Sequence, residues 1–174
     1  KLLSVYAHII ESQHMHTVLA VATAAVRNAR NGASFIKRVR AKTGIPMTVI
    51  SGYAEATLGF SGVIHTIDEK DFLLFDLGGA SIEISLVKNK KRVKSISIPI
   101  GAVTLTQKFD SSDKISSSQR KEMEEFISSQ LHRISWLPKS GLPVIGIGGT
   151  VRNLAKMHQR KTGYPRNSIT TVSR

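Results

Sequence analysis

The alternation of apolar and polar positions divides the chain into two α/β segments. In the first, residues 3–14 show helical spacing, Thr17–Thr23 reads as a buried strand, and an amphipathic helix then runs to a Gly–Ile–Pro break. A second strand at Met47–Ile50 precedes a helix over Tyr53–His65, for which Ser51 is a suitable N-cap. Because strands and helices alternate, this segment predicts a parallel sheet with right-handed crossovers.

The second segment has a different pattern. Three short apolar or alternating runs, separated by turn residues, predict an antiparallel meander: Phe72–Leu77, Ile82–Val87 and Val93–Ile98. A helix is expected near Gly101, and the spacing of Ser116 and Gln119 is typical of a capping box that starts another. A strand over Leu142–Ile147 and a helix over Thr150–Gln159 complete the pattern.

The change of pattern places a domain boundary near Thr66–Lys70, with residues 1–67 in one domain and residues 68–174 in the other. An apolar fraction of 41% in 174 residues supports a sizeable buried core. The expected fold class is therefore α/β. The first residue is not Met and falls close to a predicted helix, so the chain is expected to be a fragment of a longer protein.

The chain carries a net charge of +13 and contains no cysteine. The charge favours an anionic partner, with phosphate-rich ligands first, but it does not separate polyphosphate, nucleic acid and a merely basic surface. The lack of cysteine excludes disulfides, thiolate metal sites and a cysteine nucleophile. No apolar run approaches the roughly 20 residues that span a bilayer. No membrane partner is therefore expected, and the cytoplasm is the expected location.

One glycine turn lies between two acid-bearing strands. Asp76 is near the end of the first strand, and Ser81 and Glu83 begin the second. Gly78 and Gly79 let backbone amides approach a phosphate closely, and the Ser81 hydroxyl is a further donor. The two carboxylates are hard oxygen ligands that suit Mg²⁺. An ordinary glycine hairpin with two surface acids is the alternative interpretation.

Another glycine motif follows the last predicted strand. Gly148, Gly149 and Thr150 begin the final predicted helix, so their amides form a candidate anion site. Glycine after a strand is also common for packing reasons, and this alternative stays open. The dinucleotide-binding fingerprint does not fit, because Arg152 leaves no third glycine in register.

Glu55 is a candidate general base. It lies in the first turn of its predicted helix, with Gly59 and Gly62 on about the same face, and a partly desolvated carboxyl there could take a proton from water. Glutamate is also favoured in a first helical turn by the helix dipole, which is the alternative. The histidines show no metal-ligand spacing, and Ser81 has no His–Asp partner pattern, so a serine nucleophile has little support.

In their order and spacing, three motifs resemble those of the exopolyphosphatase/guanosine pentaphosphate phosphohydrolase (Ppx/GppA) family, within the actin/sugar-kinase/Hsp70 ATPase superfamily. They are ISGYAEATLGFSGV, DLGGASIEIS and GIGGTVRNLAK; upstream, ATAAVRNARNGASFIKRV is similar to the family's Arg-containing segment. The resemblance runs over nearly the whole chain. It implies two ribonuclease H-like (actin-like ATPase) lobes with mixed sheets, the first incomplete at its N-terminus.

The resemblance also implies an activity, the release of orthophosphate from polyphosphate or guanosine pentaphosphate by a base-activated water. Glu55 matches the family's proposed general base, and Arg27 matches a phosphate-contacting arginine. Asp76 and Glu83 match the acids tied to Mg²⁺. The phosphate-binding positions are matched by Gly78, Gly79, Ser81, Gly148, Gly149 and Thr150.

Some positions depart from the family pattern. Ala80 stands where a third glycine is usual, Ile82 where Thr is usual, and Ala54 replaces one of two adjacent glutamates. The family's first phosphate loop is expected upstream of Lys1, so the fragment alone is expected to lack part of the charge neutralisation, and whether it is active without that loop stays open. Two other function classes stay open, a small-molecule kinase of the superfamily and a non-catalytic polyanion-binding relative. Nucleic acid is not expected as a partner, and a homodimer of the full-length protein is compatible with the resemblance.

Overall fold

The structure, a computed structural model, describes residues 1–109, 114–137 and 141–163. The chain forms two compact units that divide after Glu55. This division falls inside helix α4 (Gly52–Val63), because apolar side chains from the second half of α4 pack on the sheet that follows it. The expected division into domains 1–67 and 68–174 stays a prediction.

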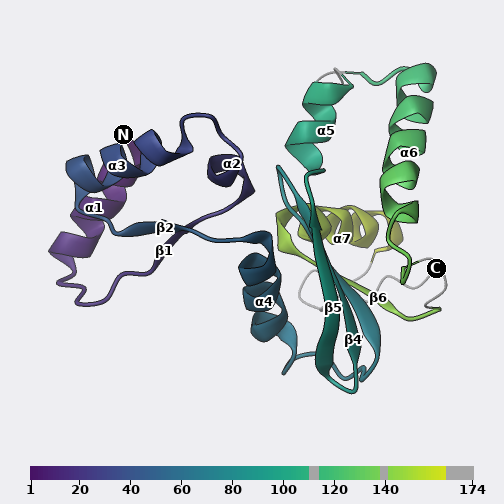
Figure 1. The fold of residues 1–174 in the computed structure, drawn as a ribbon. Helices are drawn as coiled ribbons and strands as arrows, with labels where there is room; N and C mark the ends of the chain where they lie inside the picture. Colours follow the sequence, from purple (N-terminus) through teal and green to yellow (C-terminus); the bar gives the residue numbers. More distant parts are fainter. Residues whose placement is uncertain (110–113, 138–140, 164–174) are drawn as a thin grey trace. The chain divides into compact units, whose positions relative to one another are not determined.

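The first unit contains a two-stranded parallel sheet and three helices (Figure 1). Its elements are α1 (Leu2–Ser12), β1 (Ala20–Ala22), α2 (Ala24–Arg27), α3 (Gly32–Thr43) and β2 (Met47–Val49). Ala20 pairs with Met47 and Ala22 with Val49, which confirms the parallel pairing predicted from the alternation of strands and helices. The first strand is shorter than the Thr17–Thr23 run suggested.

The single amphipathic helix expected before Gly44 is wrong, because the chain forms two helices there. A turn over residues 28–31 separates α2 from α3. Gly32 then begins α3 so close to α2 that a Cβ on it would lie 2.3 Å from the Val26 carbonyl oxygen. Apolar residues recur at roughly helical intervals on both sides of the turn, which is why periodicity alone suggested one helix.

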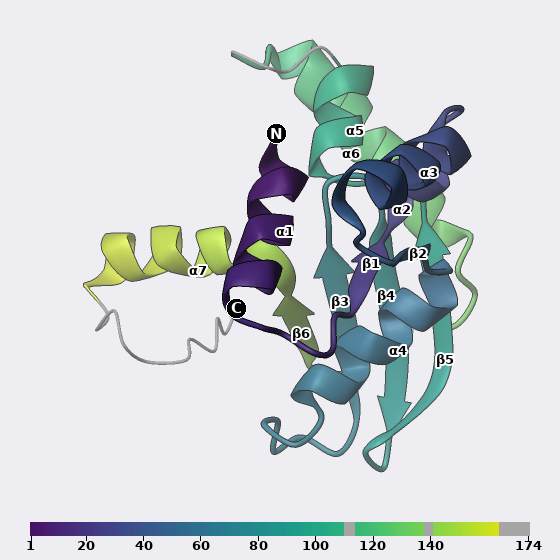
Figure 2. The same ribbon diagram turned by 90° about the vertical axis from the view of Figure 1, so that its left-hand side faces the viewer.

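The second unit is built on a four-stranded mixed sheet with the order β5-β4-β3-β6, whose strands lie side by side in Figure 2. The strands are β3 (Phe72–Leu77), β4 (Ile82–Lys88), β5 (Lys91–Ile98) and β6 (Val144–Ile147). The first three form the predicted antiparallel meander, and β6 runs parallel to β3. The observed architecture is therefore α/β with a mixed sheet in this unit.

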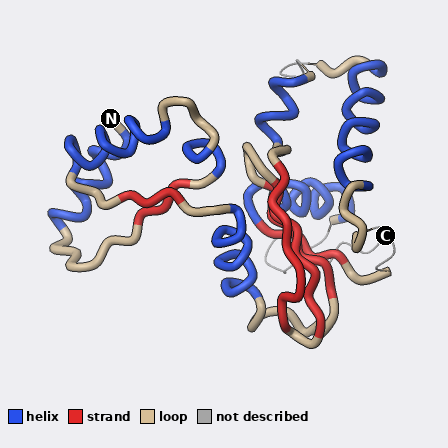
Figure 3. Tube along the Cα trace, in the orientation of Figure 1, coloured by secondary structure: helices blue, strands red, loops and turns tan. Residues whose placement is uncertain are grey.

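The two faces of this sheet are covered by different helices. Phe72, Leu74 and Val87 form a buried cluster on one face, against which Phe60 and Val63 of α4 pack. The opposite face carries a second cluster, to which α5 (Ala102–Lys108) and α6 (Ser117–His132) contribute. Both helices are seen at the upper right of Figure 3. Helix α7 (Gly148–Thr162) follows β6 directly.

Two local predictions about helix starts are confirmed. Ser116 and Gln119 exchange the side-chain to backbone hydrogen bonds of a capping box, at 2.9 and 3.2 Å, and the Ser51 hydroxyl accepts from the Ala54 amide at 3.1 Å. None of the helices among the described residues combines the length and the apolar character that a membrane span requires.

Candidate functional site

Two carboxylates and a hydroxyl form one row across the sheet of the second unit. Asp76 of β3 is the pairing partner of Glu83 of β4, and Glu83 is in turn the partner of Ser97 of β5. Directly paired residues point to the same face of a sheet, with Cβ atoms about 4.5–5.5 Å apart. The sheet therefore brings together the two acids that the sequence analysis selected.

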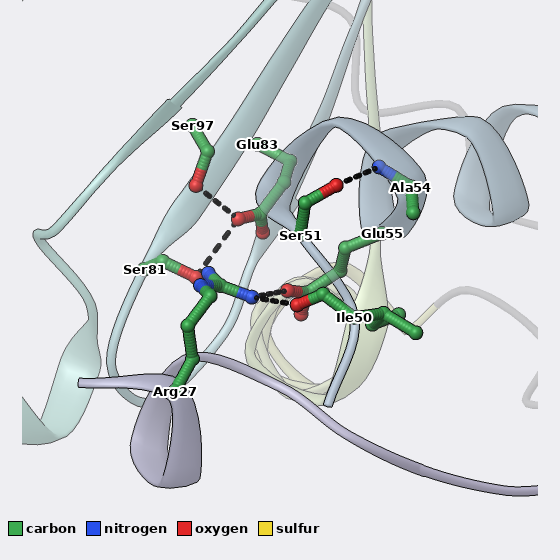
Figure 4. A network of polar contacts seen from close by, with 8 residues as sticks. All are labelled: Arg27, Ile50, Ser51, Ala54, Glu55, Ser81, Glu83 and Ser97. Carbon is green, nitrogen blue, oxygen red and sulfur yellow. Dashed lines mark hydrogen bonds and ion pairs between the residues drawn. The ribbon is translucent and has the colours of Figure 1, made fainter. Parts of the chain in front are cut away.

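Glu83 is held by two hydroxyl groups. Its side chain is buried, and its Oε1 accepts from Ser97 Oγ at 2.7 Å and from Ser81 Oγ at 2.9 Å (Figure 4). The Ser81 hydroxyl, which we expected to donate to a phosphate, therefore donates to Glu83 in this structure. Sequence reasoning missed Ser97. In the sequence, Ser97 is marked only by its position in the alternating pattern of β5. That pattern does not show that Ser97 lies opposite an acid.

Asp76 is packed against glycine on two sides. A Cβ on Gly148 would lie 2.3 Å from Asp76 Oδ1, and a Cβ on Gly59 of α4 would lie 4.0 Å from Oδ2 and 3.2 Å from the Ile147 side chain. Gly148 also has a φ of +90°, a backbone conformation that favours glycine. Gly62, by contrast, faces open space. The glycine of the third motif is thus required where β6 passes into α7, beside the Asp76 carboxylate.

The turn between β3 and β4 directs its carbonyl groups to helix α5. Gly78 N donates to Ser81 O at 3.0 Å, which closes the turn. The carbonyl oxygens of Gly78 and Gly79 accept from amides in the first turn of α5. Within residues 1–109, 114–137 and 141–163, no hydrogen bond takes up the amides of Gly79, Ala80 and Ser81. These amides therefore have no acceptor in the described part of the chain.

The third motif forms the N-terminus of α7. Gly148, Gly149 and Thr150 are its first three residues, and no side chain caps the helix. The first amides of a helix have no acceptor inside the helix, so an uncapped N-terminus favours an anion. Arg152 reaches back toward this end, since its Nη2 lies 3.9 Å from where a Cβ on Gly149 would stand. Sequence reasoning treated Arg152 only as evidence against a dinucleotide motif.

Arg27 and Glu55 form an ion pair in the first unit. Arg27 ends α2, and its Nη1 donates to Glu55 Oε2 at 3.1 Å and to the Ile50 carbonyl oxygen at 2.8 Å (Figure 4). Both side chains are largely but not fully buried, at 22% and 19% exposed. The Glu55 amide donates to Ser51 O at 2.9 Å, which places the carboxylate in the first turn of α4.

The predicted site residues thus fall into two groups, one in each compact unit. Arg27 and Glu55 belong to the first unit, and the two acids with their glycine turns belong to the second. Among the described residues, no three His, Cys, Asp or Glu side chains cluster as a metal site would require. Among these residues, Asp76 and Glu83 are the neighbouring carboxylates that could hold a divalent cation, and Mg²⁺ is commonly bound by one or two carboxylates when phosphate oxygens and waters supply its other ligands.

Comparison with known proteins gives one consistent family. The profile of the Ppx/GppA phosphatase family matches residues 1–173. A bifunctional 3-dehydroquinate synthase/phosphatase of Fusobacterium nucleatum is 32% identical over 178 residues, an alignment that takes in 97% of this chain and 27% of that protein.

Two solved structures are similar over almost all of the chain. An exopolyphosphatase from Cytophaga hutchinsonii has a TM-score of 0.83 and 27% identity, with 97% of this chain and 55% of that one covered. A Ppx/GppA family member from Aquifex aeolicus has a TM-score of 0.69 and 30% identity, with 94% and 53% covered. The chain spans about half the length of these structures and about a quarter of the curated relative.

Proposed function

Because the chain belongs to the Ppx/GppA phosphatase family, a family of hydrolases, we propose that it carries the catalytic base and two phosphate-binding turns of a phosphoanhydride hydrolase. The proposed substrates are inorganic polyphosphate and guanosine pentaphosphate. The observation that carries the proposal is the Asp76 carboxylate, which lies beside the third glycine motif at Gly148 and two residues before the turn that begins at Gly78.

In the proposed reaction, a water oxygen attacks the terminal phosphorus, and the bond from that phosphorus to the bridging oxygen breaks. Glu55 accepts the proton of the water, orthophosphate leaves, and the shortened chain keeps the bridging oxygen. Positioning of the base supports this role, because Arg27 donates to the Glu55 carboxylate and is itself anchored by its hydrogen bond to the Ile50 carbonyl oxygen. General-base assistance of this kind contributes about 10²–10⁴-fold to a rate.

The glycine turns supply donors for the phosphate oxygens. The amides of Gly79, Ala80 and Ser81 and the uncapped N-terminus of α7 have no competing acceptors in the described part of the chain, so they would neutralise charge on the transferred group. The reaction requires the Glu55 carboxylate and these turns to meet around the same phosphate. Two ribonuclease H-like lobes, as the family resemblance implies, are the arrangement that we propose for this.

A Mg²⁺ ion fits the donors of the second unit. Asp76 and Glu83 are neighbouring carboxylates on one sheet face, and two hydroxyl groups keep Glu83 Oε1 in place. Bound there, the ion would neutralise negative charge on the phosphate oxygens. Asp76 and Glu83 would thus hold the ion beside the amides of the Gly78–Ser81 turn.

The substitution Glu55→Gln in the intact protein tests the proposal. It keeps the size of the side chain but removes its basicity, so release of orthophosphate from polyphosphate is expected to fall by about 10²–10⁴-fold. Binding of polyphosphate should persist, because the phosphate-binding turns are unchanged. Glu69→Gln, at an exposed position, is the matched control.

Full turnover by the Glu55→Gln protein would remove Glu55 from the mechanism. A comparison of long polyphosphate with guanosine pentaphosphate in the same phosphate-release assay identifies the substrate. Loss of ATP that depends on an added acceptor would instead support a kinase.

A further inference from the structure

Helix α5 begins directly against the turn between β3 and β4. Ala102 N donates to Gly78 O at 2.9 Å, and Val103 N and Thr104 N donate to Gly79 O at 2.8 and 3.1 Å. The first amides of a helix have no acceptor within the helix. Here the turn supplies these acceptors, so the turn and the start of α5 form one hydrogen-bonded body.

These hydrogen bonds also determine where the amides of the turn point. In a planar trans peptide unit, the carbonyl oxygen of one residue and the amide hydrogen of the next point in opposite directions. Since the carbonyl groups of Gly78 and Gly79 point to α5, the amides of Gly79 and Ala80 point away from it. In the described part of the chain, neither amide has an acceptor.

Gly101 holds the second of these peptide units in place by close contact. A Cβ on Gly101 would lie 2.5 Å from both the carbonyl carbon and the oxygen of Gly79, and 2.6 Å from Ala80 N. Gly101 has a φ of −146° and a ψ of 173°, an extended conformation that any residue adopts. Space, and not backbone conformation, therefore excludes a side chain at this position.

Thr104 fixes Gly101 in turn. Its Oγ1 accepts from Gly101 N at 2.8 Å and donates to Gly101 O at 3.1 Å. Gly101 is consequently held on one side by the first turn of α5 and pressed on the other against the Gly79–Ala80 peptide unit. A methyl group at residue 101 would have to displace that unit.

We propose that Gly101, with the first turn of α5, is a positioning device that aims the amides of Gly79 and Ala80 at a phosphoryl oxygen of the substrate. This inference rests on the proposed function, since it assigns an orientation to one of its phosphate-binding turns. Gly101 itself does not touch the phosphate. Its effect is transmitted through the peptide unit that it contacts.

The experiment compares Gly101→Ala with Gly62→Ala in the intact protein. Gly62 lies in α4 with no atom near its absent Cβ, so the same substitution there leaves the turn unchanged. Binding of tripolyphosphate is measured by calorimetry, together with kcat and KM for phosphate release. Loss of one hydrogen bond to a charged group corresponds to about 10- to 100-fold in affinity. We expect this weakening for Gly101→Ala, with KM raised accordingly, and no change for Gly62→Ala.

Amide NMR signals give a readout that a purely structural role would not affect. Tripolyphosphate should shift the signals of Gly79 and Ala80 in the wild-type protein, and the shifts should be reduced in Gly101→Ala. If Gly101→Ala does not fold, Thr104→Val replaces it, because this variant loses the hydroxyl that holds Gly101. Thr104→Ser keeps the hydroxyl and should restore binding.

Unchanged tripolyphosphate affinity in both Gly101→Ala and Thr104→Val would overturn the inference. So would signals of Gly79 and Ala80 that do not respond to tripolyphosphate. The proposed function can fail separately, since a wild-type protein that binds tripolyphosphate but releases no orthophosphate refutes hydrolysis and still permits the comparison of affinities. A wild-type protein that neither binds nor hydrolyses it refutes both.

Discussion

Substitution of Gly148 by alanine tests the contact between the third glycine motif and Asp76. Residue 148 has a φ of +90°, and an alanine Cβ would lie 2.3 Å from Asp76 Oδ1 and 3.5 Å from its Cγ. An alanine therefore meets two separate penalties, one from the backbone conformation and one from overlap with the carboxylate. Either the Asp76 side chain or the start of α7 has to move.

The two penalties have different expected sizes. A left-handed backbone conformation costs an L-residue about 1–2 kcal/mol. Forcing one extra carbon into a packed site costs about 1–3 kcal/mol more. The free energy of unfolding should therefore fall by about 2–5 kcal/mol, a large part of the roughly 5–15 kcal/mol typical of a domain.

Gly163→Ala separates the two contributions. Gly163 ends the same helix with a φ of +71°, and no atom lies within 4 Å of its absent Cβ. This variant should therefore show only the backbone penalty, about 1–2 kcal/mol. Urea unfolding of the intact protein measures both variants, and phosphate release measured beside it should fall only for Gly148→Ala.

A double-mutant cycle with Asp76→Ala then isolates the contact. In the Asp76→Ala background, Gly148→Ala should cost no more than Gly163→Ala does, because the overlapping carboxylate is gone. If Gly148→Ala costs the same with and without the Asp76 carboxylate, the two groups are not in contact and the placement of Asp76 argued above is wrong.

Two further predictions concern the hydrogen-bonded acids of the second unit. Ser97→Ala removes one of the two donors to the buried Glu83 carboxylate and should lower the free energy of unfolding by about 1.5–3 kcal/mol, measured by urea unfolding; Ser97→Thr should keep most of it. For Asp71, the Asn89 backbone amide, and to a lesser degree Lys88, lowers the carboxyl pKa below its ordinary value. A lowered folded-state pKa means that the unfolded chain binds more protons, so this stabilisation is present above about pH 4 and is lost as the pH falls through the folded-state pKa. Asp71→Asn should remove that part of the pH dependence of unfolding.

Matched substitutions accompany both predictions. Ser95→Ala removes a hydroxyl from the same face of β5, where Ser95 Oγ accepts from Arg92 Nη1 and, among the described contacts, donates to no carboxylate. Asp68→Asn removes an exposed carboxylate near Asp71. A loss of stability from Ser95→Ala equal to that from Ser97→Ala would show that Glu83 has no special dependence on its hydroxyl donors. If Asp71→Asn leaves the pH dependence of the free energy of unfolding unchanged, the assigned lowering of the Asp71 pKa is wrong.

Local features of the fold followed well from the sequence. The three strands of the meander fall within a few residues of their predicted ranges, and Ser51 and the Ser116–Gln119 pair cap helices as expected. Such features depend on neighbouring residues and on side-chain alternation, which the sequence displays directly. The turn that divides α2 from α3 was missed, because it depends on a contact between Gly32 and Val26 that periodicity does not encode.

The candidate site divides in the same way. The sequence by itself indicated the family, and it selected the residues to which we assign chemistry: the acids at 55, 76 and 83 and the glycine turns. Only the tertiary structure decided what each group contacts, as in the pairing of Arg27 with Glu55 and the binding of Ser97 to Glu83. These partners lie 28 and 14 positions apart in the sequence. Strand register and helix packing bring them together, and both depend on the whole chain and not on neighbouring residues.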